Sequence, residues 1–416
     1  MRSFHVSSIG VAAVAALALP LAATTPVAAS GSAPPPAAEL AGSTQSLPLE
    51  SLPGTDRAAD GASQEGLAQR EVRPFSLAGV VWDNADDELQ GSAQIRTRSR
   101  ADGTWSSWQD LETHNHDHAA DPDTPEAARP LHGSTAPLWV GDSDAVEARV
   151  RPEGEPLPQG LRLDLVDPGA DPAEEDAGEG TPETRAPDVL PALDQAATRA
   201  EAVEVAGTTA EPRPYTGKRP RIITRKGWGA DEHMRESGFI YTKSVKVAFV
   251  HHTGTGNAYS CAQAPSVLRG IYRYHVKSNG WRDIGYNFAV DKCGNIYEGR
   301  AGGVAKAVMG AHTLGFNTNS MGIALLGTYN DTNPSTAALK AIEQLSAWKL
   351  GLYGVNPKGR STLVSAGGNR YKKGSSVKLN AISGHRDGFA TDCPGTRLYG
   401  RLGAVRVAAA HYQGRR

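Results

Sequence analysis

The 416-residue chain has few cysteines, and only Cys261, Cys293 and Cys393 are present. In an oxidising compartment three cysteines permit one disulfide and leave one thiol over, which excludes a framework of several disulfides. After residue 23 the chain also lacks any stretch that approaches the roughly 20 apolar residues of a membrane-spanning helix. The sequence therefore predicts no stable membrane anchor.

The first residues have the features of a secretory signal. Arg2 precedes an apolar, alanine-rich stretch over residues 9–23, and residues 27–29 offer the small side chains that signal peptidase accepts. We expect cleavage after Ala29. The mature protein would then be exported, either secreted or held in the cell wall.

Acidic and basic residues are divided unequally along the chain. Residues 1–212 contain 13 Lys plus Arg against 35 Asp plus Glu, a net charge of −22, whereas residues 213–416 contain 30 against 10, a net charge of +20. A basic half of this kind favours contact with a polyanionic surface or substrate, with a solvated basic exterior as the alternative. No nucleic-acid motif accompanies the charge, so we expect no nucleic-acid partner and favour anionic cell-wall polymers.

Composition divides the chain into five segments, and its 27 prolines and 46 glycines indicate long linkers. Linkers of this composition would leave the folded parts mobile relative to each other. The segments are a signal peptide (1–29), a disordered arm (30–72), a small all-β accessory domain (73–168), an acidic Pro/Ala-rich linker with a short helix over 190–203 (169–218) and a C-terminal catalytic domain (219–416).

Periodicity predicts different structures in the two folded parts. Short strand-like runs in the first part span residues 75–82, 93–98, 138–140, 146–150 and 161–166. In the C-terminal part strands alternate with helices, which predicts an α/β fold. The expected strands are 245–252, 286–290, 296–298, 321–326 and 380–383, and the expected helices are 264–277, 335–352 and 396–411.

One disulfide pairing is preferred. Cys261 and Cys293 flank a single helix-plus-turn unit, whereas Cys393 lies in a histidine-rich constellation. Either pairing that uses Cys393 would remove its thiolate from those histidines. We therefore predict a Cys261–Cys293 disulfide, worth roughly 3 kcal/mol in the loop-entropy account.

The most informative stretch is residues 384–394, in which His385 and Cys393 lie eight residues apart. Both side chains can bind zinc, and upstream an apolar run ends in the paired His251 and His252, which can supply a third ligand. Because side chains alternate along a strand, only one of this pair can face the metal, and alternation does not decide which. Three protein ligands and one open position define a hydrolytic zinc site.

The other histidines receive no ligand role. His114, His116 and His118 alternate in an acidic loop, where such spacing can bind metal weakly, but a solvated polar loop is the preferred interpretation. A structural zinc site would need a fourth protein ligand, and no further Cys or His lies at a suitable spacing. The sequence therefore favours an open site over a closed one.

Six motifs carry a resemblance that covers about 190 of the 416 residues. They are residues 223–230, 251–253, 280–288, 296–300, 310–317 and 384–394. Through them residues 221–411 resemble a peptidoglycan recognition protein (PGRP) domain of the type 2 N-acetylmuramoyl-L-alanine amidase family. The resemblance implies a mixed central β-sheet flanked by helices. The N-terminal half is similar to the accessory region of exported actinobacterial members, which implies no activity.

The resemblance also implies roles for individual residues. It implies zinc ligands at His251, His385 and Cys393, catalytic residues at Tyr286 and Thr391, and stem-peptide contacts from His312 and Asn317. Tyr286 would position or polarise the water or the carbonyl. Thr391 would hydrogen-bond the tetrahedral intermediate.

We therefore expect an exported, Zn²⁺-dependent amidase that hydrolyses the bond between N-acetylmuramic acid and L-alanine. Its partner would be peptidoglycan, bound through muramyl peptides, and a monomer is expected. The main alternative is a binding-only recognition protein. Binding-only members of the family commonly lack the Cys ligand, whereas Cys393 is present here.

Overall fold

The computed structural model describes residues 42–52, 64–113, 117–171, 188–206 and 215–416. The predicted signal peptide, together with His114 and His116, lies outside the described residues. Among the helices that are described, none is long and apolar enough to cross a lipid bilayer.

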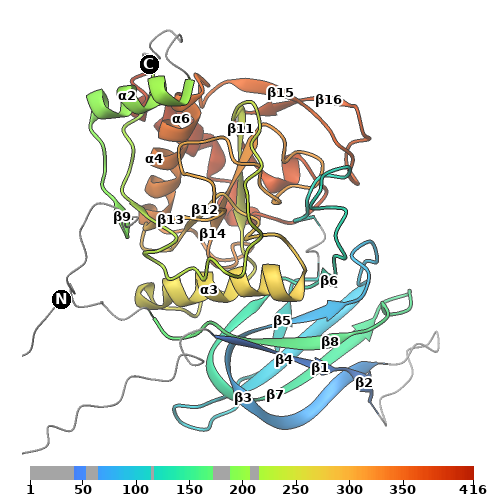
Figure 1. The fold of residues 1–416 in the computed structure, drawn as a ribbon. Coiled ribbons are helices and arrows are strands. Elements are labelled where there is room, and N and C mark those ends of the chain that lie inside the picture. The colour runs from blue at the N-terminus through green and yellow to red at the C-terminus, as the bar shows by residue number, and fades with distance from the viewer. Residues whose placement is uncertain (1–41, 53–63, 114–116, 172–187, 207–214) are drawn as a thin grey trace, which may run out of the picture. The chain divides into compact units, whose positions relative to one another are not determined.

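An antiparallel sheet of eight strands lies in the N-terminal part of the described chain (Figure 1). Its main path runs β1-β8-β3-β7-β4-β5, and β2 and β6 pair with β3. Buried Ala93, Ile95 and Thr97 alternate along β4 with less buried neighbours, as the sequence predicts. The strands are β1 (Ser43–Pro48), β2 (Glu50–Ser51), β3 (Glu65–Trp82), β4 (Gly91–Ser99), β5 (Gln109–Leu111), β6 (Gly133–Ser134), β7 (Leu138–Pro152) and β8 (Arg162–Asp167).

A second sheet, of seven strands, has the order β17-β11-β14-β12-β13-β10-β9 (Figure 1). Its strands are β9 (Val189–Leu190), β10 (Ile222–Ile223), β11 (Val247–His252), β12 (Phe288–Val290), β13 (Ile296–Glu298), β14 (Ser320–Leu325) and β17 (Ile382–Gly384). Strand β11 pairs in parallel with β14 and β17, whereas β12 pairs antiparallel with β13. These directions confirm the predicted mixed sheet. The hairpin of β15 (Arg360–Val364) and β16 (Ser376–Asn380) was not predicted.

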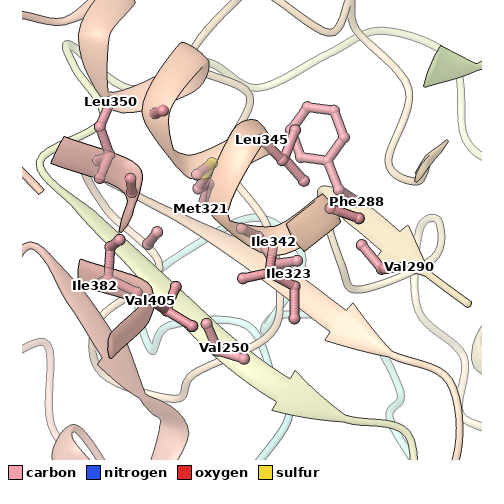
Figure 2. Packing of buried hydrophobic residues seen from close by; sticks show 14 of the residues in the cluster. Val250, Phe288, Val290, Met321, Ile323, Ile342, Leu345, Leu350, Ile382 and Val405 are labelled. Carbon is pink, nitrogen blue, oxygen red and sulfur yellow. The ribbon is translucent and has the colours of Figure 1, made fainter. Parts of the chain in front are cut away.

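Helices α4 (Thr336–Leu352) and α6 (Leu402–Tyr412) share a core with the seven-stranded sheet. The Ser335 hydroxyl caps α4 by accepting a hydrogen bond from the backbone N–H of Ala338. Figure 2 shows Ile342 of α4 beside Ile323 of β14, with Val250 of β11 in the same fully buried cluster. Each such side chain contributes about 1.5–3 kcal/mol through burial, and together they fix β11 in place.

The remaining helices and helical turns lie between residues 195 and 399. They are α2 (Gln195–Ala206), α3 (Ala264–Arg273), α5 (Thr396–Tyr399), a π-helical turn (Tyr274–Ser278) and two 3₁₀ turns (Cys261–Gln263 and His385–Asp387). The predicted disulfide is present between Cys261 and Cys293, whose Cα atoms lie 6.2 Å apart. It ties the start of α3 to the turn before β13. Cys393 is the free, buried cysteine.

Helix α3 packs against both sheets. One buried cluster contains Leu77 and Val166 of the eight-stranded sheet, Leu268 of α3 and Ala324 of the seven-stranded sheet. The Tyr274 hydroxyl, just beyond α3, also lies within hydrogen-bond distance of the Val80 carbonyl oxygen, at 3.3 Å. These contacts differ from the expectation that the two folded parts move independently. The linker composition indicated mobility, but it carries no information on the apolar sheet face that α3 covers.

Strand β1 and the first part of β3 lie within the segment predicted as a disordered arm. β1 pairs antiparallel with β8 in six residue pairs, from Ser43 with Asp167 to Pro48 with Arg162. The prediction of disorder is therefore wrong for residues 43–48 and 65–72. Every residue of β1 and β2 is half-buried or exposed, so backbone pairing, and not side-chain periodicity, defines this edge.

Candidate metal centre

Three strand and turn positions bring the predicted ligands together. His251 lies near the end of β11, a strand whose six residues are all buried. His385 begins the 3₁₀ turn that follows β17, and the Asp387 carboxylate fixes this turn by accepting the Gly384 N–H at 3.0 Å. Cys393 returns to the same turn because its carbonyl oxygen accepts the Arg386 N–H at 3.1 Å.

The structure places a fourth side chain, His118, in this group. One potential ligand atom from each of His118, His251, His385 and Cys393 lies within 4.8 Å of the others, and all four residues are buried. The Cys393 Sγ lies 3.7 Å from His251 Nδ1 and 3.8 Å from His118 Nε2. The ring centroid of His385 lies 4.5 Å from that of His118 and 4.5 Å from that of His251.

The interpretation of His118 as part of a solvated loop is wrong. Its exposed fraction is 5%, and it reaches the group from the segment that follows β5 in the N-terminal part of the chain. The sequence offered one signal, the alternating histidines, but gave no reason to join this loop to residues more than 130 positions away. The expectation that no further His could serve as a fourth ligand is also wrong, because His118 lies in the group.

The arrangement fits a tetrahedral metal ion. Tetrahedral zinc, with bonds of about 2.3 Å to sulfur and 2.0–2.1 Å to nitrogen, holds its ligand atoms roughly 3.3–3.6 Å apart, close to the distances from Cys393 Sγ. Both ring nitrogens of buried His385 lack a hydrogen-bond partner among the described residues. Buried polar atoms are rarely left without partners, and a metal ion would satisfy one of these nitrogens.

Asp117 lies behind two of the imidazoles. Its Oδ1 is 2.8 Å from His118 Nδ1, and its Oδ2 is 3.7 Å from His385 Nδ1. A carboxylate at the outer nitrogen fixes the ring so that the other nitrogen can face a metal. Burial alone would raise the Asp117 pKa, but His118 and His385 outweigh it, so the pKa is lowered and the carboxylate stays ionised.

The surroundings of the group favour neutral ligands until a cation is bound. Burial, reinforced by neighbouring histidines, lowers the pKa of His251 well below its ordinary value, and burial lowers that of His385 to about 3. Imidazole binds metals in this neutral form. Burial also raises the pKa of the Cys393 thiol well above its usual range. A bound cation would reverse that shift, because a coordinating thiol is deprotonated.

His252 faces away from the group. Its Nε2 lies 3.2 Å from Glu112 Oε2, and its Nδ1 accepts the Tyr329 N–H at 3.3 Å. Both ring nitrogens are therefore engaged elsewhere. Of the histidine pair, His251 is the one that lies beside Cys393, while His252 links β11 to the segment after β5.

Tyr286 and Thr391 lie beside the same group. The Tyr286 ring centroid is 5.6 Å from those of His251 and His118, and burial followed by the nearby Cys393 raises the pKa of its hydroxyl well above its ordinary value. The Thr391 hydroxyl oxygen accepts the Cys393 N–H at 3.2 Å. A hydrogen bond from Thr391 also helps to lower the pKa of Asp117.

The two predicted substrate-binding residues are covered in this structure. His312 is fully buried, and its Nδ1 and Nε2 lie 3.0 Å and 3.4 Å from the hydroxyls of Thr313 and Ser320. Asn317 is also fully buried, and its side-chain amide donates to the Ala119 carbonyl and to the Asp121 carboxylate, each at 2.8 Å. Neither side chain faces an open groove.

A cavity of about 230 Å³ adjoins the group. Its lining includes His118, Glu112, His252, Thr391 and Cys393, so residues of both folded parts form its wall. Typical small-molecule sites have volumes of about 300–1,000 Å³. The space beside the ligands is therefore small for a peptide-bearing sugar.

Two protein families match the chain. Residues 31–187 match the family described as Rv3811 N-terminal galactose-binding domain-like, and residues 241–396 match the N-acetylmuramoyl-L-alanine amidase family. Peptidoglycan-recognition protein SC2 of Drosophila melanogaster is 35% identical over 181 residues, which cover 44% of this chain and 84% of that protein.

Two further proteins are similar to part of this chain. The human N-acetylmuramoyl-L-alanine amidase is 33% identical over 186 residues, which are 44% of this chain but only 28% of the human protein. The solved structure of Drosophila PGRP-LB has 26% identity and a TM-score of 0.35, with 44% of this chain and 92% of that chain covered.

The fold and the site define an all-β domain joined to an α/β domain, and both contribute to a buried group of side chains that could hold a metal ion. The chain belongs to the peptidoglycan recognition protein and type 2 N-acetylmuramoyl-L-alanine amidase family.

Proposed function

We propose that this protein is an exported, zinc-dependent amidase that hydrolyses the amide between N-acetylmuramic acid and L-alanine in peptidoglycan. The observation that carries the proposal is the buried convergence of His251, His385 and Cys393, whose potential ligand atoms lie within 4.8 Å of one another. Similarity to a human protein named for this amidase activity supports the same conclusion.

His251, His385 and Cys393 would hold the ion. Zinc bound there would polarise the scissile carbonyl and lower the pKa of a bound water towards about 7. The protein's own part is to hold these ligands in a dry site of fixed shape. Their strand and turn positions, defined by β11, β17 and the Arg386–Cys393 contact, provide that rigidity.

Tyr286 and Thr391 would act on the substrate from their positions beside His251 and Cys393. The raised pKa of Tyr286 keeps its hydroxyl protonated, so it can donate a hydrogen bond to an oxygen that gains negative charge. The Thr391 hydroxyl, next to Cys393, can hydrogen-bond the same tetrahedral centre from another direction. Donors fixed before the reaction stabilise the developing charge more than mobile water does.

A second candidate function is recognition of peptidoglycan without hydrolysis. It is favoured by one observation, the presence of His118 as a fourth potential ligand. Catalytic zinc sites have three protein ligands and an open position, whereas structural sites are closed by four. A site closed by four ligands has no open position for hydrolysis, so a protein with such a site would not cleave muramyl peptides.

The test is incubation of the full-length mature protein with purified peptidoglycan, followed by mass spectrometry of the soluble products. We expect release of free stem peptides that begin with L-alanine, and loss of that release after treatment with a chelator. Binding to peptidoglycan without release of stem peptides, by the wild type and also by the variants described below, would favour the recognition function.

A further inference from the structure

We propose that His118 is the fourth protein ligand of the metal site, and that residues 117–126, here named the strap, hold the proposed amidase in a closed state. This inference rests on the proposed function. It adds that the N-terminal domain controls access to the metal and to the peptide groove. Activity would then require the strap to leave the C-terminal domain.

The orientation of His118 is that of a ligand and differs from that of a simple packing residue. Its Nε2 faces the Cys393 Sγ at 3.8 Å, while its Nδ1 is held by Asp117 at 2.8 Å. Metal-bound histidines almost always give their second nitrogen to a carboxylate, carbonyl or water in this way. With His118 in place, the position that a hydrolytic zinc site leaves open is filled.

Asp121 of the strap occupies hydrogen-bond donors of the predicted peptide groove. Its carboxylate accepts from the backbone N–H groups of Gly315 at 2.9 Å, Asn317 at 3.2 Å and Thr318 at 3.3 Å. It also accepts from the Asn317 side-chain amide at 2.8 Å. A carboxylate that binds several convergent N–H groups imitates the carboxylates of a peptide ligand, so the strap and an anionic stem peptide would compete for these donors.

Further contacts fasten the same segment along its length. The Leu314 N–H donates to the Asp117 carbonyl oxygen at 3.0 Å. At the far end Glu126 forms a two-point ion pair with Arg300, at 2.7 Å and 2.9 Å, and its side chain is fully buried. Bidentate pairs of this type are geometrically specific. The strap is thus held at three places, through Asp117, Asp121 and Glu126.

The acidic residues of the strap contact the basic half of the chain. Asp117, Asp121 and Glu126 come from the acidic half of the chain, and each meets donors or histidines of the basic half. A substrate with carboxylates would use the same attraction. The strap therefore occupies the closed site, and an anionic muramyl peptide would compete with it for the same donors.

The test compares the full-length wild-type protein with His118→Ala and with a matched control, His132→Ala. His132 follows the strap and lies 2.8 Å from the Ser278 carbonyl oxygen, but it is not in the metal-ligand group. Three properties are measured: the visible absorption of the cobalt(II)-substituted proteins, zinc affinity in competition with a chromogenic chelator, and release of stem peptides from peptidoglycan.

We expect His118→Ala to change the cobalt(II) absorption and to lower zinc affinity by about tenfold or more, because a direct ligand is lost. Its release of stem peptides should rise at least about tenfold, since the open position of a hydrolytic site is restored. His132→Ala should match the wild type in all three measurements.

Two results would overturn the proposal. An unchanged cobalt(II) spectrum and unchanged zinc affinity in His118→Ala would show that His118 is not a ligand. Release by the wild type that equals release by His118→Ala would show that the site is not closed. A spectral change without release by either protein would instead support the fourth ligand and count against the amidase function.

A second pair of variants separates closure from ligation and does not alter the metal ligands. Asp121→Asn weakens the contacts of the strap with residues 315–318, whereas Asp142→Asn changes an exposed carboxylate of β7 that pairs with Arg100 and lies outside the strap. We expect increased release from Asp121→Asn alone. Equal release from the two variants would overturn the role of the strap.

Discussion

The Nε2 of His118 lies 3.8 Å from the Sγ of Cys393, although 275 positions separate the two residues in the sequence. The contact joins the all-β part of the chain to the end of the α/β part. It means that the candidate metal centre is assembled from two folded parts. Its state therefore depends on their association as well as on local geometry.

Replacement of the predicted thiolate ligand tests the metal site directly. Cys393→Ala should lose zinc and stem-peptide release while it retains binding to peptidoglycan, because the thiol is buried among ligands and not on a binding surface. Zinc content of the purified protein and mass spectrometry of the products measure the two effects. Undiminished turnover would contradict the assignment.

Asp117 should act through the histidines that it contacts. Asp117→Asn keeps the size of the side chain but removes the charge beside His118 and His385, so zinc affinity should fall by about 10- to 100-fold. Chelator competition measures this change. Asp110→Asn, an exposed position hydrogen-bonded to Gln94, is the control, and an equal effect at both sites would refute the role of Asp117.

The Glu126–Arg300 pair should make stability depend on pH. Burial alone would raise the Glu126 pKa, but Arg300 outweighs it and holds the pKa below its usual value. A carboxyl with a lowered folded-state pKa adds stability above its unfolded pKa of about 4.3, and this stability is lost as the pH falls through the folded value. The contribution of Glu126 should therefore disappear in acid.

The measurement is the difference in unfolding free energy between the wild type and Glu126→Gln. At neutral pH the variant should be less stable by about 3–5 kcal/mol, because the buried Arg300 loses its charged partner. The difference should shrink below about pH 4. Burial raises the pKa of Asp121, an effect of opposite sign, but it is common to both proteins. A constant difference from pH 7 to pH 3 would contradict the prediction.

Sequence and structure agree best where function and local pattern coincide. The strand that contains His251 and the turn at His385 follow from apolar periodicity and a distinctive motif, and the structure brings both to Cys393. The position of His118 could not be predicted, because it depends on how α3 packs against the eight-stranded sheet. That packing involves residues far apart in the sequence and leaves no local pattern.

The bounds of some β strands also could not be predicted from the sequence. The sequence predicts two short strands over residues 138–140 and 146–150, whereas the structure has one strand, β7, from Leu138 to Pro152. Polar residues between the two runs hide the continuity, which pairing with β3 and β4 maintains. In the β15–β16 hairpin, polar and charged residues likewise separate the apolar ones, and cross-strand pairing defines the strands.

The disulfide should stabilise the folded protein by an amount that grows slowly with the length of the loop that it closes. Replacement of both Cys261 and Cys293 by Ser should lower the free energy of unfolding by about 3–4 kcal/mol, from the entropy of a loop with a sequence separation of 32. Denaturant unfolding under non-reducing conditions measures the loss. A variant as stable as the wild type would contradict the prediction.

Gly322 of β14 leaves space for the His312 ring. A Cβ at this position would lie 2.5 Å from the His312 Cγ, so Gly322→Ala should cost about 1–3 kcal/mol through overpacking. Gly403 lies on α6, where a Cβ would meet only the end of Arg406 at 3.8 Å. Gly403→Ala is therefore the control and should stabilise the protein by about 0.5–1 kcal/mol. Equal thermal unfolding shifts would refute the packing argument.

X-ray absorption spectroscopy at the zinc edge of the full-length, zinc-loaded protein measures the number and type of ligands at this site. The account predicts one sulfur at about 2.3 Å and three imidazole nitrogens at about 2.0–2.1 Å, from Cys393, His118, His251 and His385. In His118→Ala the imidazole scattering should fall to two rings. A wild-type site with no sulfur ligand, or with only two imidazoles, would contradict the account.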